Sequence, residues 1–171
     1  MRIRSLLLTA TVVLIISSNT PAQADHQYKD PSGRFQLELM GDWRAVSYND
    51  AVGRPRTDFV YRDRREGLLK ITKEARSGSS LQDMVRTEEE TLRTYRPGFE
   101  RAATEPFGGG KLRGLRLSFY STVGGRQVAS THYYLEDGDS VWVLRFVGRR
   151  GAIDAIRNIT DQMARSFQLR K

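Results

Sequence analysis

The stretch GRFQLELMGDW, residues 33–43, indicates how the fold begins. Phe35, Leu37 and Leu39 alternate with polar residues, which is the period of a β-strand with one buried face. Gly41 and Asp42 supply a turn, and Trp43 begins the next apolar run. We therefore expect this strand to open a sheet, with the tryptophan at the edge of the core.

The residues before this stretch have the pattern of a secretory signal peptide. A basic start is followed by an apolar segment, residues 6–16, and Ala22-Gln23-Ala24 is a small-x-small cleavage site. A membrane anchor would need about 17–25 apolar residues, more than this segment provides. We expect cleavage near Ala24, export to the periplasm or the extracellular space, and a single mature domain, residues 25–171, without a transmembrane segment.

The composition restricts the classes of partner and site. The chain has 28 Lys and Arg against 20 Asp and Glu, and removing the two leader arginines leaves a formal net charge of +6. An exported basic protein is expected to meet anionic lipid or an acidic envelope protein, and no nucleic acid. The sequence has no cysteine, which excludes disulfides, thiolate metal sites and a cysteine nucleophile.

The rest of the chain predicts strands first, then a helix, then further strands and a closing helix. Turn signals at Gly124-Gly125 and Asp137-Gly138 indicate hairpins between the last three strands. The fold class is therefore α+β: an antiparallel sheet of about seven to eight strands with two main helices packed on it as an α/β/α sandwich. The further strands are expected at residues 43–48, 57–62, 68–75, 99–105, 112–122, 127–136 and 140–147, and the helices at 81–96 and 151–167.

The two helices have one apolar face each. Ser80 is the expected N-cap of the first, and Pro97-Gly98 ends it. Its buried face should carry Leu81, Met84, Val85, Leu92 and Tyr95, and Glu88, Glu89 and Glu90 should be solvated. The closing helix should direct Ile153, Ile156, Ile159, Met163 and Phe167 inward.

This order of elements resembles the Mog1/PsbP-like fold, which includes the PsbP proteins of photosystem II and many bacterial exported proteins. The matching features are Tyr28, Pro31, Gly33, the alternating Phe35-Leu37-Leu39, Asp42-Trp43, the central helix, the meander around Trp142 and the terminal Ser166-Phe167. Met40 stands where the common pattern has proline before the turn. The resemblance implies an accessory or binding protein without a shared catalytic apparatus, and it does not imply photosystem binding.

Strand alternation in the meander suggests one ligand surface. With a simple register, Leu115, Leu117 and Phe119 share a face with Tyr133, Leu135, Trp142, Leu144 and Phe146. The other face would carry polar and aromatic side chains suited to recognition. The alternative is that a helix or solvent simply covers this face. The predicted ligand-binding residues are Arg116, Tyr120, His132, Tyr134 and Arg145.

Catalytic and metal patterns are weak. His132, with Ser130 and Asp137 or Asp139, has the residue types of a hydrolase, but the Gly-x-Ser-x-Gly elbow is missing. Gly108-Gly109-Gly110-Lys111 lacks the spacing of a phosphate loop and predicts a turn. We expect no catalytic, metal or cofactor site. The leading hypothesis is a non-enzymatic exported accessory protein; the alternatives are a hydrolase-like enzyme using His132 and a surface binder of anionic lipid or an acidic partner.

Overall fold

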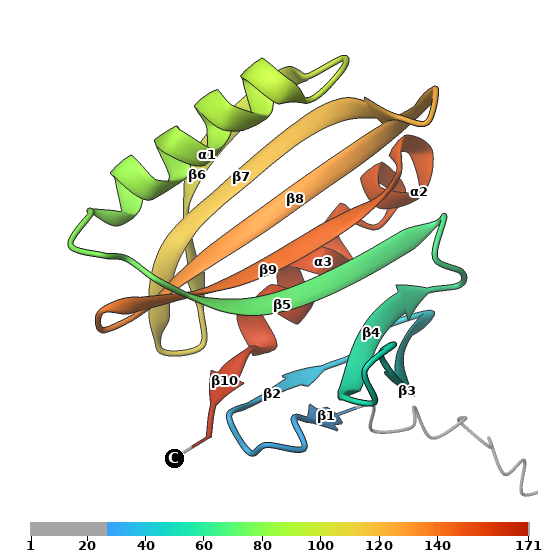
Figure 1. Cartoon of the computed structure of the whole chain (residues 1–171), viewed down its shortest axis with the longest axis vertical. Coiled ribbons are helices and arrows are strands. Elements are labelled where there is room, and N and C mark those ends of the chain that lie inside the picture. Colours follow the sequence, from blue (N-terminus) through green and yellow to red (C-terminus); the bar gives the residue numbers. More distant parts are fainter. Residues whose placement is uncertain (1–26, 171) are drawn as a thin grey trace, which may run out of the picture.

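A computed structural model describes residues 27–170, so the predicted signal peptide, residues 1–24, lies outside the described residues. The longer strands form one antiparallel sheet (Figure 1). Its strands are β3 (Trp43–Asn49), β4 (Pro55–Tyr61), β5 (Gly67–Ala75), β6 (Glu100–Gly109), β7 (Leu112–Val123), β8 (Arg126–Asp137) and β9 (Ser140–Arg149). They lie side by side in the order β3-β4-β5-β9-β8-β7-β6. The predicted meander of β7, β8 and β9 is therefore confirmed.

The opening strand does not belong to this sheet. β2 (Phe35–Glu38) lies between β1 (Gln27–Lys29) and β10 (Gln168–Leu169) in a separate three-stranded sheet. Neither β1 nor β10 was predicted, because segments of three and two residues are too short to show a periodic pattern. The small sheet thus joins the beginning of the described chain to its end.

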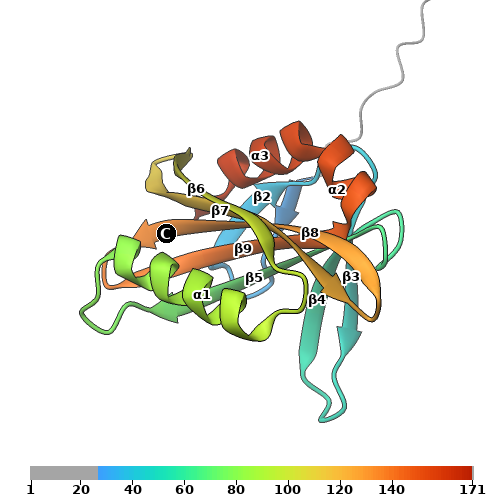
Figure 2. The same cartoon turned by 90° about the horizontal axis from the view of Figure 1, so that it is seen from above.

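Helices cover both faces of the large sheet, which confirms the predicted α/β/α layering (Figure 2). α1 (Leu81–Tyr95) packs on β7 and β8 from one side. On the other side, α2 (Arg150–Ala155) contacts β8 and β9, and α3 (Arg157–Ser166) contacts β2 and β6. The single closing helix that we predicted is therefore two helices. Ile156 leaves helical geometry with ψ of 18°, and the break lets each piece follow the strands beneath it.

α1 is bounded as the sequence predicts. The Ser80 hydroxyl accepts a hydrogen bond from the Asp83 amide at 3.1 Å, and Arg96 follows the last helical residue. Leu81 and Val85 are buried, whereas Tyr95 is 78% exposed and was wrongly assigned to the buried face. At the far end of the helix the backbone returns to the sheet at Pro97-Gly98, where the Pro97 carbonyl accepts a hydrogen bond from the Thr122 amide of β7 at 2.7 Å.

The predicted role of the opening stretch in the core is confirmed. Phe35 packs against Phe167 and Trp142, with ring centroids 5.2 Å and 5.4 Å apart. Trp43 meets Phe146 edge-on at 5.4 Å. Fully burying such side chains contributes about 2–3 kcal/mol each. The Phe35 contacts hold the small sheet against the α2 and α3 side of the large one, whereas the Trp43 contact joins β3 to β9 within the large sheet.

The register of the meander differs from the simple one that we assumed. The two-residue turn after Val123 pairs Leu117 with His132, and the next turn pairs His132 with Arg145. Directly opposed residues share a face, so the odd residues of β7 lie with the even residues of β8. Leu115, Leu117 and Phe119 therefore face α1, while Tyr133, Leu135, Trp142, Leu144 and Phe146 face α2 and α3.

Candidate functional site

The five predicted ligand-binding residues do not form one surface. His132, Tyr134 and Arg145 lie on the α1 face, and Arg116 and Tyr120 lie on the face covered by α2 and α3. The assumption of a shared face was wrong because the two-residue turn between β7 and β8 reverses which residues face together. Their binding of a ligand stays a prediction, and each has a partner within the protein.

On the α1 face, Glu88 connects the helix to the sheet. Its carboxylate lies 3.2 Å from Nδ1 of His132 and accepts a hydrogen bond from Nη2 of Arg145 at 3.3 Å. Burial raises the pKa of Glu88, but the His132 hydrogen bond and the Arg145 charge outweigh it and lower the pKa to about 2. The prediction that Glu88 is solvated was wrong, because periodicity alone does not show which polar residue of a helix meets a polar strand residue.

His132 lacks the surroundings of a hydrolase base. Its side chain is 5% exposed, and burial lowers its pKa despite the opposing hydrogen bond to Glu88. Its nearest hydroxyl partner is that of Tyr134, at 3.4 Å from Nδ1. Among residues 27–170, no serine or threonine side chain hydrogen-bonds to it. A base needs access to both substrate and nucleophile, so the geometry favours a structural role.

On the opposite face, Arg116 and Tyr120 hold the helices. Nη1 of Arg116 donates to both oxygens of Asp161 on α3, at 2.8 Å and 2.7 Å, and its Nη2 pairs with Glu105. Such charge-assisted hydrogen bonds are about twice as strong as neutral ones. The Tyr120 hydroxyl donates to Asp154 on α2 at 3.1 Å. Both side chains thus fasten a helix to the sheet.

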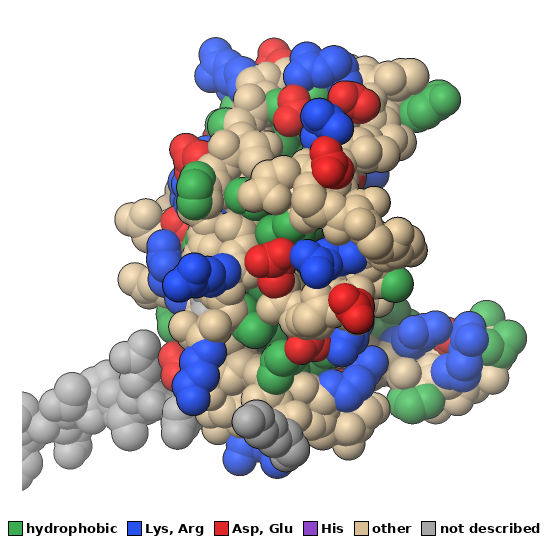
Figure 3. Space-filling model, turned by 90° about the vertical axis from the view of Figure 1, so that its left-hand side faces the viewer, with side chains coloured by type: hydrophobic (Ala, Val, Ile, Leu, Met, Phe, Trp, Pro, Cys, Tyr) green, Lys and Arg blue, Asp and Glu red, His purple; other side chains and the backbone are tan. Residues whose placement is uncertain are grey.

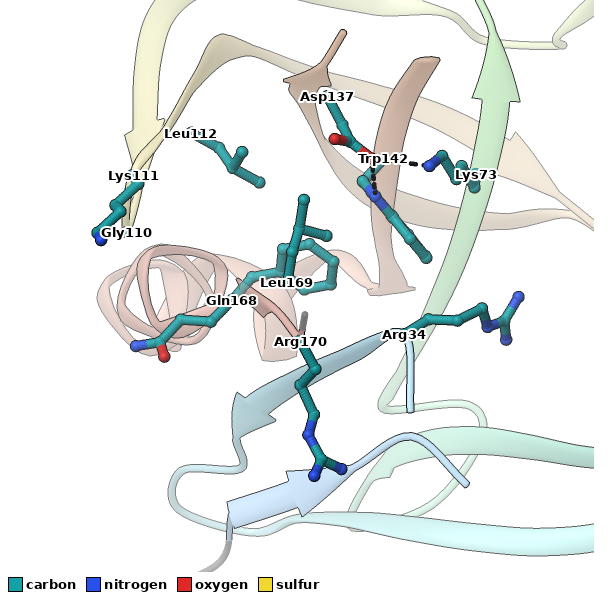
Figure 4. A pocket seen from close by; sticks show the side chains of 11 residues that line it. Arg34, Lys73, Gly110, Lys111, Leu112, Asp137, Trp142, Gln168, Leu169 and Arg170 are labelled. Atoms are coloured by element: carbon teal, nitrogen blue, oxygen red, sulfur yellow. Dashed lines mark hydrogen bonds and ion pairs between the residues drawn. The ribbon is translucent and has the colours of Figure 1, made fainter. Parts of the chain in front are cut away.

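A cleft at the junction of the two sheets offers a surface that sequence reasoning did not find. We call it the β10 cleft; its volume is about 940 Å³, within the usual size of small-molecule sites. Trp142, Leu112 and Leu169 lie toward its centre, and the charged ends stand around the rim (Figure 4). It is lined by Arg34, Lys73, Gly110, Lys111, Leu112, Asp137, Trp142, Phe167, Gln168, Leu169 and Arg170.

The position of the β6–β7 turn against the chain's last strand depends on Gly110. This residue has φ of +55°, and a Cβ atom there would lie 3.1 Å from the carbonyl oxygen of Phe167. A residue with a side chain would be strained in this backbone and crowded by its neighbour. The predicted turn is shorter than the glycine run, because Gly108 and Gly109 still pair with β7 and only Gly110 and Lys111 form the turn. The turn places Lys111 at the cleft.

The charge of the cleft is unbalanced. Of its five ionisable side chains, four are basic and Asp137 is acidic. Asp137 accepts hydrogen bonds from Nζ of Lys73 at 2.7 Å and from Nε1 of Trp142 at 3.2 Å, and the Lys73 contact lowers its pKa. Within residues 27–170, neither Lys111 nor Arg170 has a carboxylate at ion-pair distance. The cleft therefore combines an apolar floor with an excess of positive charge.

Two of the cleft cations also face the floor. The Arg34 guanidinium lies 6.0 Å from the Trp142 ring, and Nζ of Lys73 lies 5.5 Å from it. Figure 3 views the molecule from the side where β10 and the β6–β7 turn lie in Figure 1, and lysine and arginine side chains are spread over it among acidic ones. The excess of charge is thus a property of the cleft, which sequence position could not show because its four cations come from four separate segments.

Known structures resemble this arrangement closely in topology. PsbP (CyanoP) from Synechocystis aligns with a TM-score of 0.59 over 90% of this chain and 98% of that one, at 14% identity. The Ran-binding protein Mog1p of Saccharomyces cerevisiae gives a TM-score of 0.56 over 84% of this chain and 94% of that one, at 10% identity. This chain has the Mog1/PsbP-like fold. LpqN, involved in cell envelope biogenesis of Mycobacterium tuberculosis, also aligns, with a TM-score of 0.58 over 85% of this chain and 90% of that one, at 11% identity.

Comparison of sequences says less about this chain than comparison of structures. No protein-family model matches the chain. A segment of 127 residues is 30% identical to the iron multicopper oxidase fer1 of Mycosarcoma maydis, and the match covers 74% of this chain but only 18% of that protein. A blue-copper centre needs two histidines and a cysteine, and this sequence has no cysteine. The similarity therefore carries no blue-copper centre to this chain.

Within the described residues, the Mog1/PsbP-like domain has neither a group of potential metal ligands nor a helix that is long and apolar enough to span a bilayer. The chemistry that its residues offer is recognition: cations, one tryptophan face and an apolar floor in the β10 cleft.

Proposed function

We propose that this protein is an exported accessory protein that acts by binding, and that the β10 cleft takes an anionic ligand with an apolar portion. One observation carries the proposal: four basic side chains and a single carboxylate surround an apolar floor in a cavity of about 940 Å³. Mog1p, which shares the fold, is a Ran-binding protein, and this supports a binding role.

The arrangement suits an amphipathic ligand for two reasons. The apolar centre, made by Trp142, Leu112 and Leu169, favours a hydrocarbon or aromatic portion because burying apolar surface contributes about 25 cal/mol per Å². The rim cations Lys111 and Arg170 are exposed and available to an anionic group. A ligand with both features would satisfy the floor and the rim together.

Calorimetric titration of the mature protein, residues 25–171, tests the proposal. Dodecyl phosphate, kept below its micelle concentration, is expected to bind at least about tenfold more tightly than dodecyl maltoside, whose head group is neutral. Inorganic phosphate alone should bind weakly, because it leaves the apolar floor exposed. Equal binding of the charged and the neutral amphiphile, or no binding of either, would refute the proposal.

Paired variants locate the site. Replacing Lys111 and Arg170 together by alanine should weaken dodecyl phosphate binding about tenfold at low salt, and less at about 0.5 M NaCl because salt screens the charge. The matched control replaces Arg65 and Arg126, two exposed arginines at other turns, and removes the same charge. An equal loss of dodecyl phosphate binding in both double variants would mean that binding depends on the net charge of the protein and would contradict a site at the β10 cleft.

Export is part of the proposal and has its own test. The leader of residues 1–24 predicts that the mature chain begins at Asp25. N-terminal sequencing of the protein recovered from the envelope or the medium should give Asp-His-Gln-Tyr. A chain that keeps its leader and stays with the cytosolic fraction would contradict export.

A further inference from the structure

The two edges of the large sheet differ in how they are protected against pairing. The β6 edge has a bulge between Glu100 and Ala103, a left-handed Arg101 with φ of 54°, and Pro106. Bulges and prolines are the usual means by which proteins keep an edge from adding strands. β3, the other edge, pairs regularly with β4 from Trp43 to Asn49 and has neither device.

Hydrogen bonding at both ends of the β3–β4 hairpin shows which backbone groups face outward. The Arg62 amide donates to the Asp42 carbonyl at 3.2 Å, and the Asp50 amide donates to the Arg54 carbonyl at 2.9 Å. Bonded pairs alternate along an antiparallel ladder, so the even-numbered residues of β3 bond to β4. Ala45 and Ser47 therefore direct their N–H and C=O groups to the free edge, where no described strand pairs with them.

The hairpin also projects from the molecule. β4 pairs with β5 only from Phe59 to Tyr61, so its first half extends beyond the sheet. Figure 2 shows β3 and β4 reaching away from the other strands, and in Figure 3 the projection stands at the lower right. Val52 at its turn is 71% exposed and Tyr48 is 41% exposed. An extended partner could reach this edge without meeting the rest of the surface.

Arginines outnumber carboxylates around the edge, because Arg54 and Arg56 share Asp50. Arg44 and Tyr48 lie on one face of β3, and Arg56 stands opposite Tyr48. The Arg64 guanidinium lies 5.6 Å from the Tyr48 ring and pairs with Asp58 at 2.8 Å, and Arg56 pairs with Asp50 at 3.2 Å. Arg44 bonds to the carbonyl of Arg62, and none of the described carboxylates lies within ion-pair distance of it. Acidic side chains on an added strand would meet these arginines.

We propose that β3 is a docking edge which takes an extended acidic segment of a partner protein as an added strand beside Ala45 and Ser47. Backbone hydrogen bonds would supply affinity, and the arginines would select acidic residues at alternate positions. A second copy fits this edge less well, because two copies of a chain with net positive charge repel each other.

The test uses the mature chain and synthetic peptides of alternating glutamate and valine, or of alternating lysine and valine. Fluorescence anisotropy should show binding of the acidic peptide and at least tenfold weaker binding of the basic one. Ser47→Pro removes an outward N–H without touching the bonds to β4 and should weaken binding about tenfold. Ser47→Ala keeps that N–H and should stay within about twofold of the parent.

A second measurement works without changing the protein. The acidic peptide methylated on every backbone nitrogen has no donor on either edge and should bind at least tenfold more weakly than the unmethylated peptide. Equal binding with and without methylation, or equal binding of both peptide charges, would overturn the proposal. So would light scattering that shows a dimer abolished by Ser47→Pro. Dodecyl phosphate binding by Ser47→Pro should stay unchanged, which separates this edge from the β10 cleft.

Discussion

Replacing Glu88 by glutamine tests the connection between α1 and the sheet. A pKa lowered from 4.5 to about 2, at about 1.4 kcal/mol per unit, corresponds to about 3 kcal/mol of stability at neutral pH. The Glu88 side chain is 22% exposed, so screening by solvent reduces the expected loss to about 2 kcal/mol. Urea unfolding followed by tryptophan fluorescence at pH 7 should show this difference.

The pH dependence gives the sharper part of this test. The folded-state pKa of Glu88 is depressed, so its stabilisation is complete above the unfolded value of about 4.5 and is lost as the pH falls toward 2. The difference in free energy of unfolding between the parent protein and Glu88→Gln should therefore shrink by more than half between pH 7 and pH 3. Glu90→Gln, an exposed carboxylate of the same helix, should change stability by less than about 0.5 kcal/mol at either pH. A gap for Glu88→Gln that stays constant down to pH 3 would refute an ionic role.

Three further variants test other parts of the structure. Asp161→Asn should lower the free energy of unfolding in urea by about 1–2 kcal/mol, because Arg116 loses one charged partner and keeps Glu105; an unchanged free energy would contradict this. Gly110→Ala should cost about 1–2 kcal/mol and weaken dodecyl phosphate binding, since its backbone is left-handed and Phe167 lies close; unchanged binding would show that the turn does not shape the cleft. The mature protein should not hydrolyse p-nitrophenyl acetate faster than its His132→Gln variant, and a loss of turnover in that variant would reinstate the hydrolase.

Much of the fold was accessible from local patterns. Alternation, capping by Ser80 and two-residue turns are set by residues close together in the chain, and they predicted the central helix and the three-stranded meander correctly. The faces of that meander could also have been derived. A two-residue hairpin turn pairs an odd residue with an even one, which places Leu117 opposite His132.

Other features are not determined by local sequence. β10 has two residues and exists because β2 lies beside it, more than a hundred residues away in the chain. The helix breaks at Ile156, and the two pieces contact different strands: α2 contacts β8 and β9, and α3 contacts β2 and β6. The apolar periodicity of the segment does not show this break. The carboxylate of Glu88 looked solvated because the strand residues it contacts are distant in sequence.

Composition and periodicity were enough to predict a basic α+β domain without cysteine, because both depend on each residue and its neighbours. The opening stretch, residues 33–43, was correctly placed in the core by its alternation. Only the tertiary structure decided which sheet it joins, where the β10 cleft opens and which edge of the large sheet is unprotected. Those features arise from contacts between distant segments, whose side chains come together only when the chain has folded.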